Sequence, residues 1–220
     1  DSIVARAGPE SIELASIEQN MGLSFLERGD LAAARNELET AIHRIDQSEF
    51  PRSNLRGLCL TALSQTFIQA EDMQGAYEPA REAVEVMEFV APTTPEHLDA
   101  LSVLATVELR LDRYEDALKT IDASVAVRSA LGDRAPADNR EIVHVWVAYQ
   151  AGKLERARSL AASYRDTMIE NKADTAETLK AISDYDPQLY ADFIAAAGLD
   201  PADYDAPAVQ VPARPAAAPK

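Results

Sequence analysis

Residues 22–41 read GLSFLERGDLAAARNELETA, and this stretch decides the fold. Its apolar residues recur at steps of three and four, as they do on one face of an α-helix. The pair Gly29-Asp30 interrupts this pattern, and the same periodicity resumes from Leu31 to Ala41. A helix, a tight turn and a second helix therefore follow one another, which predicts a helical hairpin.

The same arrangement recurs along the chain. Tight turns at 29–30, 71–72, 112–113 and 152–153 alternate with looser breaks that contain proline, near 51, 92–95 and 136. Proline cannot continue a helix interior, so the looser breaks separate successive hairpins. Small residues follow the tight turns with spacings of 42, 41 and 40 residues, at Ala34, Ala76, Ala117 and Ala157. The hairpins have nearly constant length, and small residues lie where their two helices must approach closely. This arrangement predicts a helical solenoid.

Two fragments carry a family resemblance. They are Gly22-x-x-Phe25-x-x-x-Gly29-Asp30-Leu31-x-x-Ala34-x-x-x-Leu38-x-x-Ala41 and Tyr149-x-x-Gly152-x-Leu154-x-x-Ala157-x-x-x-Ala161. Both resemble the tetratricopeptide repeat, whose usual period is about 34 residues. The longer period is similar to the long-helix repeats of kinesin light chains and of many bacterial proteins. The resemblance implies an all-α, right-handed solenoid of stacked antiparallel hairpins over about residues 11 to 170.

The later hairpins depart from the pattern of the family at three positions. Ser64 and Ala105 replace the glycine, and Glu108 stands where a large apolar residue is usual. Pro79 lies inside the second helix of the second hairpin, where it removes one backbone hydrogen bond. These departures leave the predicted fold unchanged.

The predicted organisation has four parts. Residues 1–9 form a lead-in, and four hairpins follow at about 10–48, 53–90, 95–131 and 138–170. Residues 171–199 form a capping helix pair, in which Asp186-Pro187 begins the last helix and Gly198 ends it. In residues 200–220, 12 of 21 residues are proline or alanine. Such a segment cannot bury enough surface to offset its ordering entropy, so we expect a flexible tail.

An excess of acidic residues limits the class of partner. The 220 residues include 37 Asp and Glu against 21 Lys and Arg, a formal net charge of −16. Nucleic acids and anionic membrane surfaces both attract basic faces, so the composition argues against both as partners. No stretch approaches the roughly 18 consecutive apolar residues of a membrane-spanning helix. The lone Cys59 excludes an intramolecular disulfide, and it is predicted to be a small buried hydrophobic residue.

No constellation of residues indicates catalysis. His43, His97 and His144 fall in different repeats, where surface or helix-end positions explain them. No glycine-rich phosphate loop or nucleophile elbow occurs. The many carboxylates lie at helix-surface spacings, as on a solvated face. The sequence therefore predicts no catalytic residue, no cofactor and no metal site.

A stacked solenoid presents a concave groove lined by one face of every first helix. The resemblance also offers a test, since chaperone-binding members hold a terminal carboxylate with Lys, Arg and Asn in this groove. Only Arg110 and Asn20 would match, which argues against such a carboxylate clamp. The predicted face is instead mostly neutral and could hydrogen-bond an extended peptide. Its candidate contacts are Gln19, Leu23, Thr61, Gln65, Gln69, Ser102, Thr106, Arg110, Trp146, Tyr149 and Gln150.

The aromatic pair of the fourth hairpin has two interpretations. Trp146 and Tyr149 lie three residues apart on one helix face and could anchor a partner, as aromatic residues commonly do. Alternatively, Trp146 packs between the third and fourth hairpins. A proline- and alanine-rich ligand, including the tail of this chain, would suit an aromatic anchor because polyproline II segments are already extended.

Two functions remain open at this point. The first is a non-catalytic scaffold that binds a protein segment in the concave groove, and the second is a permanent subunit of a larger assembly, docked through its convex face or its tail. The chain begins at Asp1 without a methionine or a signal peptide, which predicts a recombinant fragment or a mature product. Together with an Ala-rich, Lys-poor composition, this favours a bacterial protein, in the periplasm ahead of the cytoplasm.

Overall fold

The computed structural model describes residues 12–132, 144–145, 147–148, 151–153, 155–157, 159–160, 179–180, 183 and 187–204. The chain divides into two compact units, Asp1–Pro136 and Ala137–Lys220. The described elements are all helices, and no strand occurs within the described ranges. None of the helices described there combines the length and the apolar character that crossing a membrane requires.

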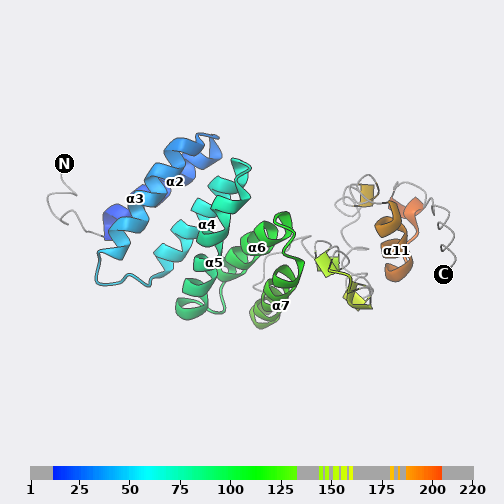
Figure 1. Ribbon diagram of the computed structural model, residues 1–220. Helices are drawn as coiled ribbons and strands as arrows, with labels where there is room; N and C mark the ends of the chain where they lie inside the picture. The colour runs from blue at the N-terminus through cyan, green and yellow to red at the C-terminus, as the bar shows by residue number, and fades with distance from the viewer. Residues whose placement is uncertain are drawn as a thin grey trace, which may run out of the picture. The chain divides into compact units, whose positions relative to one another are not determined.

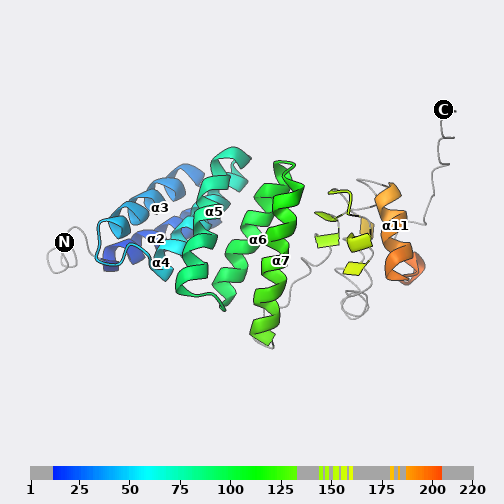
Figure 2. The ribbon, with the colours of Figure 1, turned by 60° about the horizontal axis from the view of Figure 1, so that its bottom comes forward.

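Three helical hairpins build the described part of the first unit (Figure 1). They pair α2 (Ile12–Glu27) with α3 (Leu31–Asp46), α4 (Asn54–Gln69) with α5 (Met73–Val90), and α6 (Pro95–Arg110) with α7 (Tyr114–Leu131). Each helix contacts the next along the chain, and α4 also contacts both α2 and α6. The turned view shows the same side-by-side order (Figure 2). The predicted all-α solenoid of stacked antiparallel hairpins is confirmed.

The tight turns share one backbone conformation. Each contains a residue with positive φ, at the same place in its repeat: Gly29 (75°), Glu71 (59°), Asp112 (58°) and Gly152 (70°). The next backbone N–H closes the turn on a carbonyl five residues earlier, as in the bond from Asp30 to Phe25 at 3.0 Å. The equivalent bonds are Asp72 to Phe67, Arg113 to Glu108 and Lys153 to Ala148. The turn is therefore repeated even where glycine is missing.

Side-chain caps begin most of the described helices. The Asp72 carboxylate accepts a hydrogen bond from the Gly75 amide at 2.8 Å, and the Asp30 carboxylate accepts one from Ala33 at 3.2 Å. The hydroxyls of Ser53 and Thr94 cap α4 and α6 in the same way. These caps satisfy amides that the first turn of a helix leaves without a partner.

Small residues let the two helices of each hairpin approach closely. Ala34, Ala76 and Ala117 are fully buried, and Ala157 is nearly so. A Cβ added at Gly22 would lie 2.7 Å from Cγ of Leu38, so this position has no room for a side chain. In the next hairpin the equivalent residue, Ser64, donates its hydroxyl to the Ala76 carbonyl at 3.0 Å. The predicted role of the small residues is confirmed.

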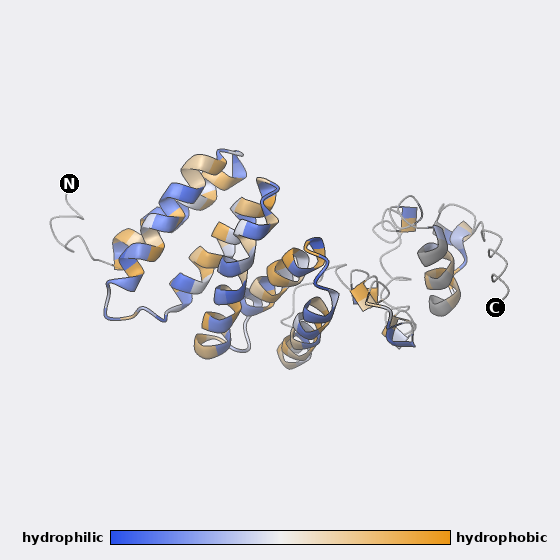
Figure 3. Cartoon of the chain, viewed as in Figure 1, coloured by the Kyte–Doolittle hydropathy of each residue, from blue (hydrophilic) through white to orange (hydrophobic). Residues whose placement is uncertain are grey.

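The core runs between hairpins as well as within them. Cys59 of α4 packs with Ala41 and Ile45 of α3, and Ala100 of α6 packs with Ala83 and Met87 of α5. Each described helix of this unit carries both hydrophobic and hydrophilic residues (Figure 3). Cys59 is completely buried, which confirms its predicted place in the core, and burial raises the pKa of its thiol to about 12.

The second unit contains α11 (Pro187–Ala197). This helix begins at proline and ends before Gly198, whose φ is 62°. A 3₁₀ helix, η2 (Pro201–Tyr204), follows it, and the Asp200 carboxylate accepts a bond from the Ala202 amide at 3.0 Å. The start of the predicted flexible tail is thus ordered, because Asp200 caps the turn and Pro201 fixes its own φ. The rest of the predicted tail, 205–220, and most of 138–186 lie outside the described residues.

Candidate functional site

The first helices of the hairpins share one exposed face. In α6 only Pro95, Asp99, Thr106 and Arg110 are exposed, and these residues lie along one side of the helix. The positions that match Thr106 in the earlier repeats are Gln65 of α4 and Leu23 of α2, both half-buried. Because α4 contacts both α2 and α6, the three positions belong to one continuous surface.

A second row of predicted contacts lies deeper. Gln19 and Thr61 are buried, with exposed fractions of 9% and 7%, so neither belongs to the exposed surface that the sequence predicted. The reason is the face on which they lie. Gln19 shares the buried side of α2 with Gly22, which packs on Leu38 of α3. The polar character of Gln19 and Thr61 therefore predicted wrongly that they are exposed.

The hydroxyl groups among the predicted contacts bond to their own helices. Thr61 donates to the Gly57 carbonyl at 2.9 Å, and Ser102 donates to the Leu98 carbonyl at 2.9 Å. Thr106 donates to the Ser102 carbonyl at 2.8 Å. Their oxygen lone pairs remain available as acceptors, so an incoming backbone N–H could still bind to the hydroxyls of Ser102 and Thr106.

The remaining predicted contacts fall into two groups. Gln69 and Arg110 are exposed in the last turns of α4 and α6. Their amide and guanidinium groups are the strongest donors that the described part of this face offers. Trp146, Tyr149 and Gln150 lie outside the described residues, so their predicted place in the groove stays a prediction.

One buried carboxylate stands behind this face. Glu108 of α6 is 4% exposed, and its Oε2 accepts a hydrogen bond of 2.7 Å from the Thr120 hydroxyl of α7. Burial raises the pKa of this carboxyl above its ordinary value. The residue that departs from the apolar pattern thus forms a polar link inside the third hairpin rather than part of a surface site.

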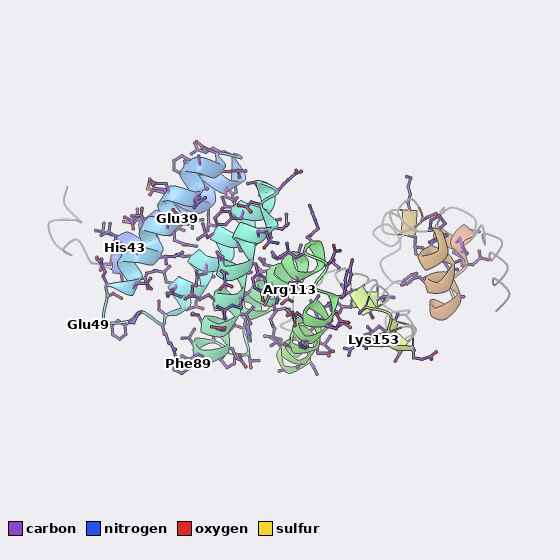
Figure 4. All side chains as sticks on the ribbon, viewed as in Figure 1. Glu39, His43, Glu49, Phe89, Arg113 and Lys153 are labelled. Carbon is purple, nitrogen blue, oxygen red and sulfur yellow. The ribbon has the colours of Figure 1, made fainter. Side chains whose placement is uncertain are left out.

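A separate hollow lies where α3 ends and α5 approaches its C-terminus. It encloses about 620 Å³, and its lining includes Asp46, Arg56, Glu82 and Phe89. The Arg56 guanidinium bridges the Asp46 carboxylate at 2.7 Å and the Glu82 carboxylate at 2.9 Å. Figure 4 shows Phe89 at the end of α5. The hollow therefore combines an ion-paired wall with an aromatic side chain.

Two exposed phenylalanines, of which Phe89 lines this hollow, were not selected from the sequence. Phe50 and Phe89 are 66% and 68% exposed, and the Arg52 guanidinium lies 5.3 Å from the centre of the Phe89 ring. The sequence signal was available, because both residues stand next to a proline-containing break between hairpins. Phe50 lies in the break itself, and Phe89 lies in the last turn of α5.

Carboxylates on the second helices are mostly ion-paired. Glu39 binds Arg35 at 2.7 Å, and Arg81 binds Glu78 at 2.8 Å and also Glu85. Figure 4 shows Glu39 together with His43 on α3. Within the described ranges no group of three or more His, Cys, Asp or Glu residues is arranged as a metal site. These carboxylates form the solvated helix surface that their spacing indicates.

The histidines of the described residues have structural positions. His97 lies in the first turn of α6, and its Nδ1 is 2.9 Å from the Pro92 carbonyl oxygen. It is buried, as is His144, whereas His43 is exposed. The expected helix-end position is thus found for His97, but it is not on the surface, because the ring bonds to the preceding connection.

Comparison with known proteins finds one curated relative and solved structures to which the chain is similar. No family model matches the chain. Over 141 residues, or 63% of its length, the chain is 28% identical to the kinesin light chain-related protein 3 of Arabidopsis thaliana. The chain spans 22% of the length of that relative.

Solved structures agree on the fold. A crystal structure from Podosopora anserina, of a protein described as a kinesin light chain with nearly identical TPR-like repeats, matches with a TM-score of 0.64 at 13% identity. That match covers 86% of this chain and 94% of the other. A second structure, of a variant of the same protein, has a TM-score of 0.63 at 14% identity, over 90% and 91% of the two chains. The hairpins of this chain therefore have the fold of the TPR-like repeats in those structures.

Proposed function

We propose that this chain is a non-catalytic scaffold that binds an extended segment of a partner protein along the face shared by α2, α4 and α6. One observation carries the proposal. In α6 the neighbouring helices bury every side but one, and the side left exposed holds Asp99, Thr106 and Arg110. A helix that is packed on all other sides leaves this stripe as the surface that a ligand could reach.

The chemistry of the face suits a peptide backbone. Gln65 and Gln69 of α4 each offer one acceptor and two donor hydrogens, and Thr106 offers an acceptor. The charged residues at its edges, such as Glu27 and Arg110, differ in sign. A mostly uncharged segment, including one rich in proline and alanine, fits this surface better than a basic or acidic one. Trp146 and Tyr149 of the fourth hairpin are the aromatic residues that the sequence predicts as further contacts for such a segment.

The test uses peptides selected from a random display library on the full chain. We expect Gln65→Ala combined with Trp146→Ala to weaken the selected peptides by about tenfold or more, because amide and aromatic contacts are lost together. Gln74→Ala is the matched control, since Gln74 is exposed on α5. The helical circular-dichroism melt of each variant should stay near that of the parent. Unchanged affinity in the double variant would exclude this face.

A second candidate function is a subunit that docks permanently through another surface. The exposed rings of Phe50 and Phe89 favour it, because large exposed aromatic residues commonly mark interfaces. Phe50→Ala combined with Phe89→Ala separates the two functions. If this variant loses its partner while Gln65→Ala with Trp146→Ala keeps it, the second candidate holds. Removal of 205–220 tests the tail in the same assay.

A further inference from the structure

A groove runs between the second helices of the first two hairpins. Whereas α4 contacts both α2 and α6, the helices α3 and α5 make no substantial contact with each other. Between them lie the hollow of about 620 Å³ and a smaller hollow of about 310 Å³. Asp46 and Glu82 line both hollows, which therefore adjoin and form one groove, the α3–α5 groove. A further hairpin before α2 or after α7 would extend the ends of the stack and would not fill this groove.

The α3–α5 groove has apolar side chains in its lining. Leu60 and Leu63 of α4 lie there beside Ile42 of α3, and Pro79 of α5 adds an apolar ring. Phe89, which is 68% exposed, lines the larger hollow. An aliphatic side chain of a ligand would cover apolar surface that is open in the free chain.

Carboxylates dominate the edges of this groove, and Figure 4 shows one of them, Glu39, on α3. Among the described residues, those whose carboxylates line the two hollows are Glu39, Asp46, Glu78, Glu82, Glu85 and Glu88. The guanidinium groups that pair with them or share the lining are those of Arg35, Arg52, Arg56 and Arg81. Six carboxylates against four guanidinium groups leave an excess of two negative charges, His43 aside.

This acidity is particular to one place in the stack. Counting 42 residues from α3 to α5 and 41 from α5 to α7 gives the equivalent positions between α5 and α7. These positions hold Arg81, Glu88, Lys119, Ala123, Ala126 and Ser129. They include one carboxylate and two basic side chains, where the α3–α5 groove has six carboxylates. The exposed ring of Phe89 likewise has Ala130 as its equivalent. Repetition of the fold therefore does not account for the acidity of the α3–α5 groove.

Arginines of the chain itself show what these side chains bind. The Arg52 guanidinium lies 5.3 Å from the centre of the Phe89 ring, as in a cation–π contact. The Arg56 guanidinium lies between the carboxylates of Asp46 and Glu82. Each carboxylate has two acceptor oxygens, so one that is bound to an arginine can still accept a hydrogen bond from another cation. The groove thus complements Lys and Arg side chains and repels acidic ones.

We propose that the α3–α5 groove binds a basic segment of a partner protein. Two Lys or Arg side chains bind the carboxylates, and aliphatic side chains between them cover the apolar lining. This binding mode rests on the second candidate function and gives it a partner of stated chemistry. Seven residues separate Glu78 from Glu85, about 10 Å along α5, and about three residues of extended chain cover the same distance. A second copy is not the occupant we choose, because two chains of net charge −16 repel one another.

The probe is a set of fluorescently labelled peptides, Gly-Ala-b-a-a-b-Ala-Gly, in which b is Arg or Lys and a is Leu, Ile or Val. Fluorescence anisotropy measures their binding to the full chain at about 0.15 M salt, where a Debye length of about 8 Å screens attraction by distant carboxylates. Matched peptides carry Gln at both b positions or Ala at both a positions. We expect saturable binding of the basic peptides, a loss of about fivefold or more with Gln, and a smaller loss with Ala.

Glu85→Gln combined with Glu88→Gln locates the binding site. Both residues are exposed on α5, and Arg81 keeps its ion pair with Glu78 when Glu85 is replaced. We expect the basic peptides to bind about fivefold or more weakly, because two charge-assisted hydrogen bonds are lost. The helical circular-dichroism melt of the variant should stay near that of the parent.

Glu27→Gln combined with Glu115→Gln is the matched control. It removes the same charge from the whole chain, but at exposed positions on α2 and α7 that do not line the groove. The affinity of the basic peptides should stay within about twofold of the parent, because salt screens distant charges. An equal loss in both variants would assign the binding to the net charge of the chain and overturn the proposal.

Other outcomes would also overturn it. One is a dissociation constant weaker than about 1 mM for every basic peptide. Another is equally strong binding of the peptides with Gln. Stronger peptide binding after removal of residues 1–11 or 205–220 would make that segment of the chain the occupant. A concentration-dependent dimer in sedimentation that Glu85→Gln with Glu88→Gln abolishes would make a second copy the occupant.

Two further comparisons keep this site separate from the proposed functions. Gln65→Ala combined with Trp146→Ala should leave the binding of the basic peptides unchanged, because neither residue lines the groove. If Phe50→Ala with Phe89→Ala loses the partner of the chain while the variant at 85 and 88 keeps it, the second candidate function holds and the basic segment is wrong.

Discussion

Glu108 shows how one residue can depart from a repeat and still be accommodated. The family pattern predicts an apolar side chain at this position, and the chain places a carboxyl there that is 4% exposed. One hydrogen bond from Thr120 compensates part of the cost of burying it. A buried carboxyl with a neutral partner is easier to protonate than one in water. Its contribution to stability therefore depends on pH.

The direction of this pH dependence follows from the raised pKa of Glu108. The folded protein holds the proton of this carboxyl more tightly than the unfolded chain does. The contribution of Glu108 to stability is therefore fully present below the unfolded pKa, and it is lost as pH rises through the folded pKa. We expect Glu108→Gln to raise the melting temperature by a few degrees near pH 7 and to leave it unchanged at about pH 3.5.

Thermal melts at the two pH values provide the measurement. Gln keeps the acceptor for Thr120, so the substitution removes the charge and leaves the hydrogen bond. Glu88→Gln is the control, because Glu88 is exposed on α5. An advantage of Glu108→Gln that is equally large at both pH values would show that burial of the charge is not the cause.

At the scale of elements, the tight turns contain conformational strain at two positions. Gly29 and Gly152 adopt positive φ without a Cβ penalty, whereas Glu71 and Asp112 adopt it with side chains. A left-handed conformation costs an ordinary residue about 1–2 kcal/mol. The repeat imposes the conformation, because each tight turn forms the same backbone hydrogen bond to the preceding helix, whichever residue occupies the position.

Glu71→Gly should therefore stabilise the protein. Relief of the strain exceeds the extra entropy that glycine brings to the unfolded chain, and we expect a net gain of about 0.5–1 kcal/mol in urea denaturation. Asp112→Gly should gain less, because the Asp112 carboxylate accepts a hydrogen bond from the Tyr114 hydroxyl. Gln69→Gly, in the last turn of α4, should cost about 1 kcal/mol. A loss for Glu71→Gly of the same size would contradict the strain at this turn.

The helices and turns were predictable because their signals are local. A glycine or an acidic residue at each tight turn, prolines at the loose breaks and alanines at spacings of 42 and 41 residues are all visible in the sequence. Burial of particular faces was less predictable. Gln19 and Thr61 are polar and yet buried, and Ile17 is apolar and yet exposed. Periodicity identifies a face of a helix, but the neighbour that covers this face is a property of the stack.

Across the first unit, contacts are confined to neighbouring helices. Among the described helices α2 to α7, each touches the next along the chain, and beyond that only the contacts of α4 with α2 and α6 are substantial. Ion pairs follow the same rule, since Arg56 joins α4 to Asp46 at the end of α3 and to Glu82 of α5. In such an array the stability is close to a sum of hairpin terms and nearest-neighbour terms. Damage in one hairpin should therefore remain near that hairpin.

Ala34→Leu tests this locality. Ala34 is fully buried in α3, and a Cβ placed at Gly22 of α2 would already lie 3.4 Å from the Ala34 carbonyl oxygen. A leucine there would force α2 and α3 apart at a cost of about 1–3 kcal/mol. Because α6 and α7 make no substantial contact with this hairpin, hydrogen exchange should accelerate in α2 and α3 and stay unchanged in α6 and α7.

Ala32→Leu is the matched control for this measurement, since Ala32 lies two residues away on the exposed side of the same helix. It should leave the exchange rates of all the helices near those of the parent, because an exposed leucine displaces nothing. If Ala34→Leu instead accelerated exchange equally from α2 to α7, the hairpins would unfold as one cooperative unit. The nearest-neighbour description would then fail, although the contacts between adjacent helices would remain as described.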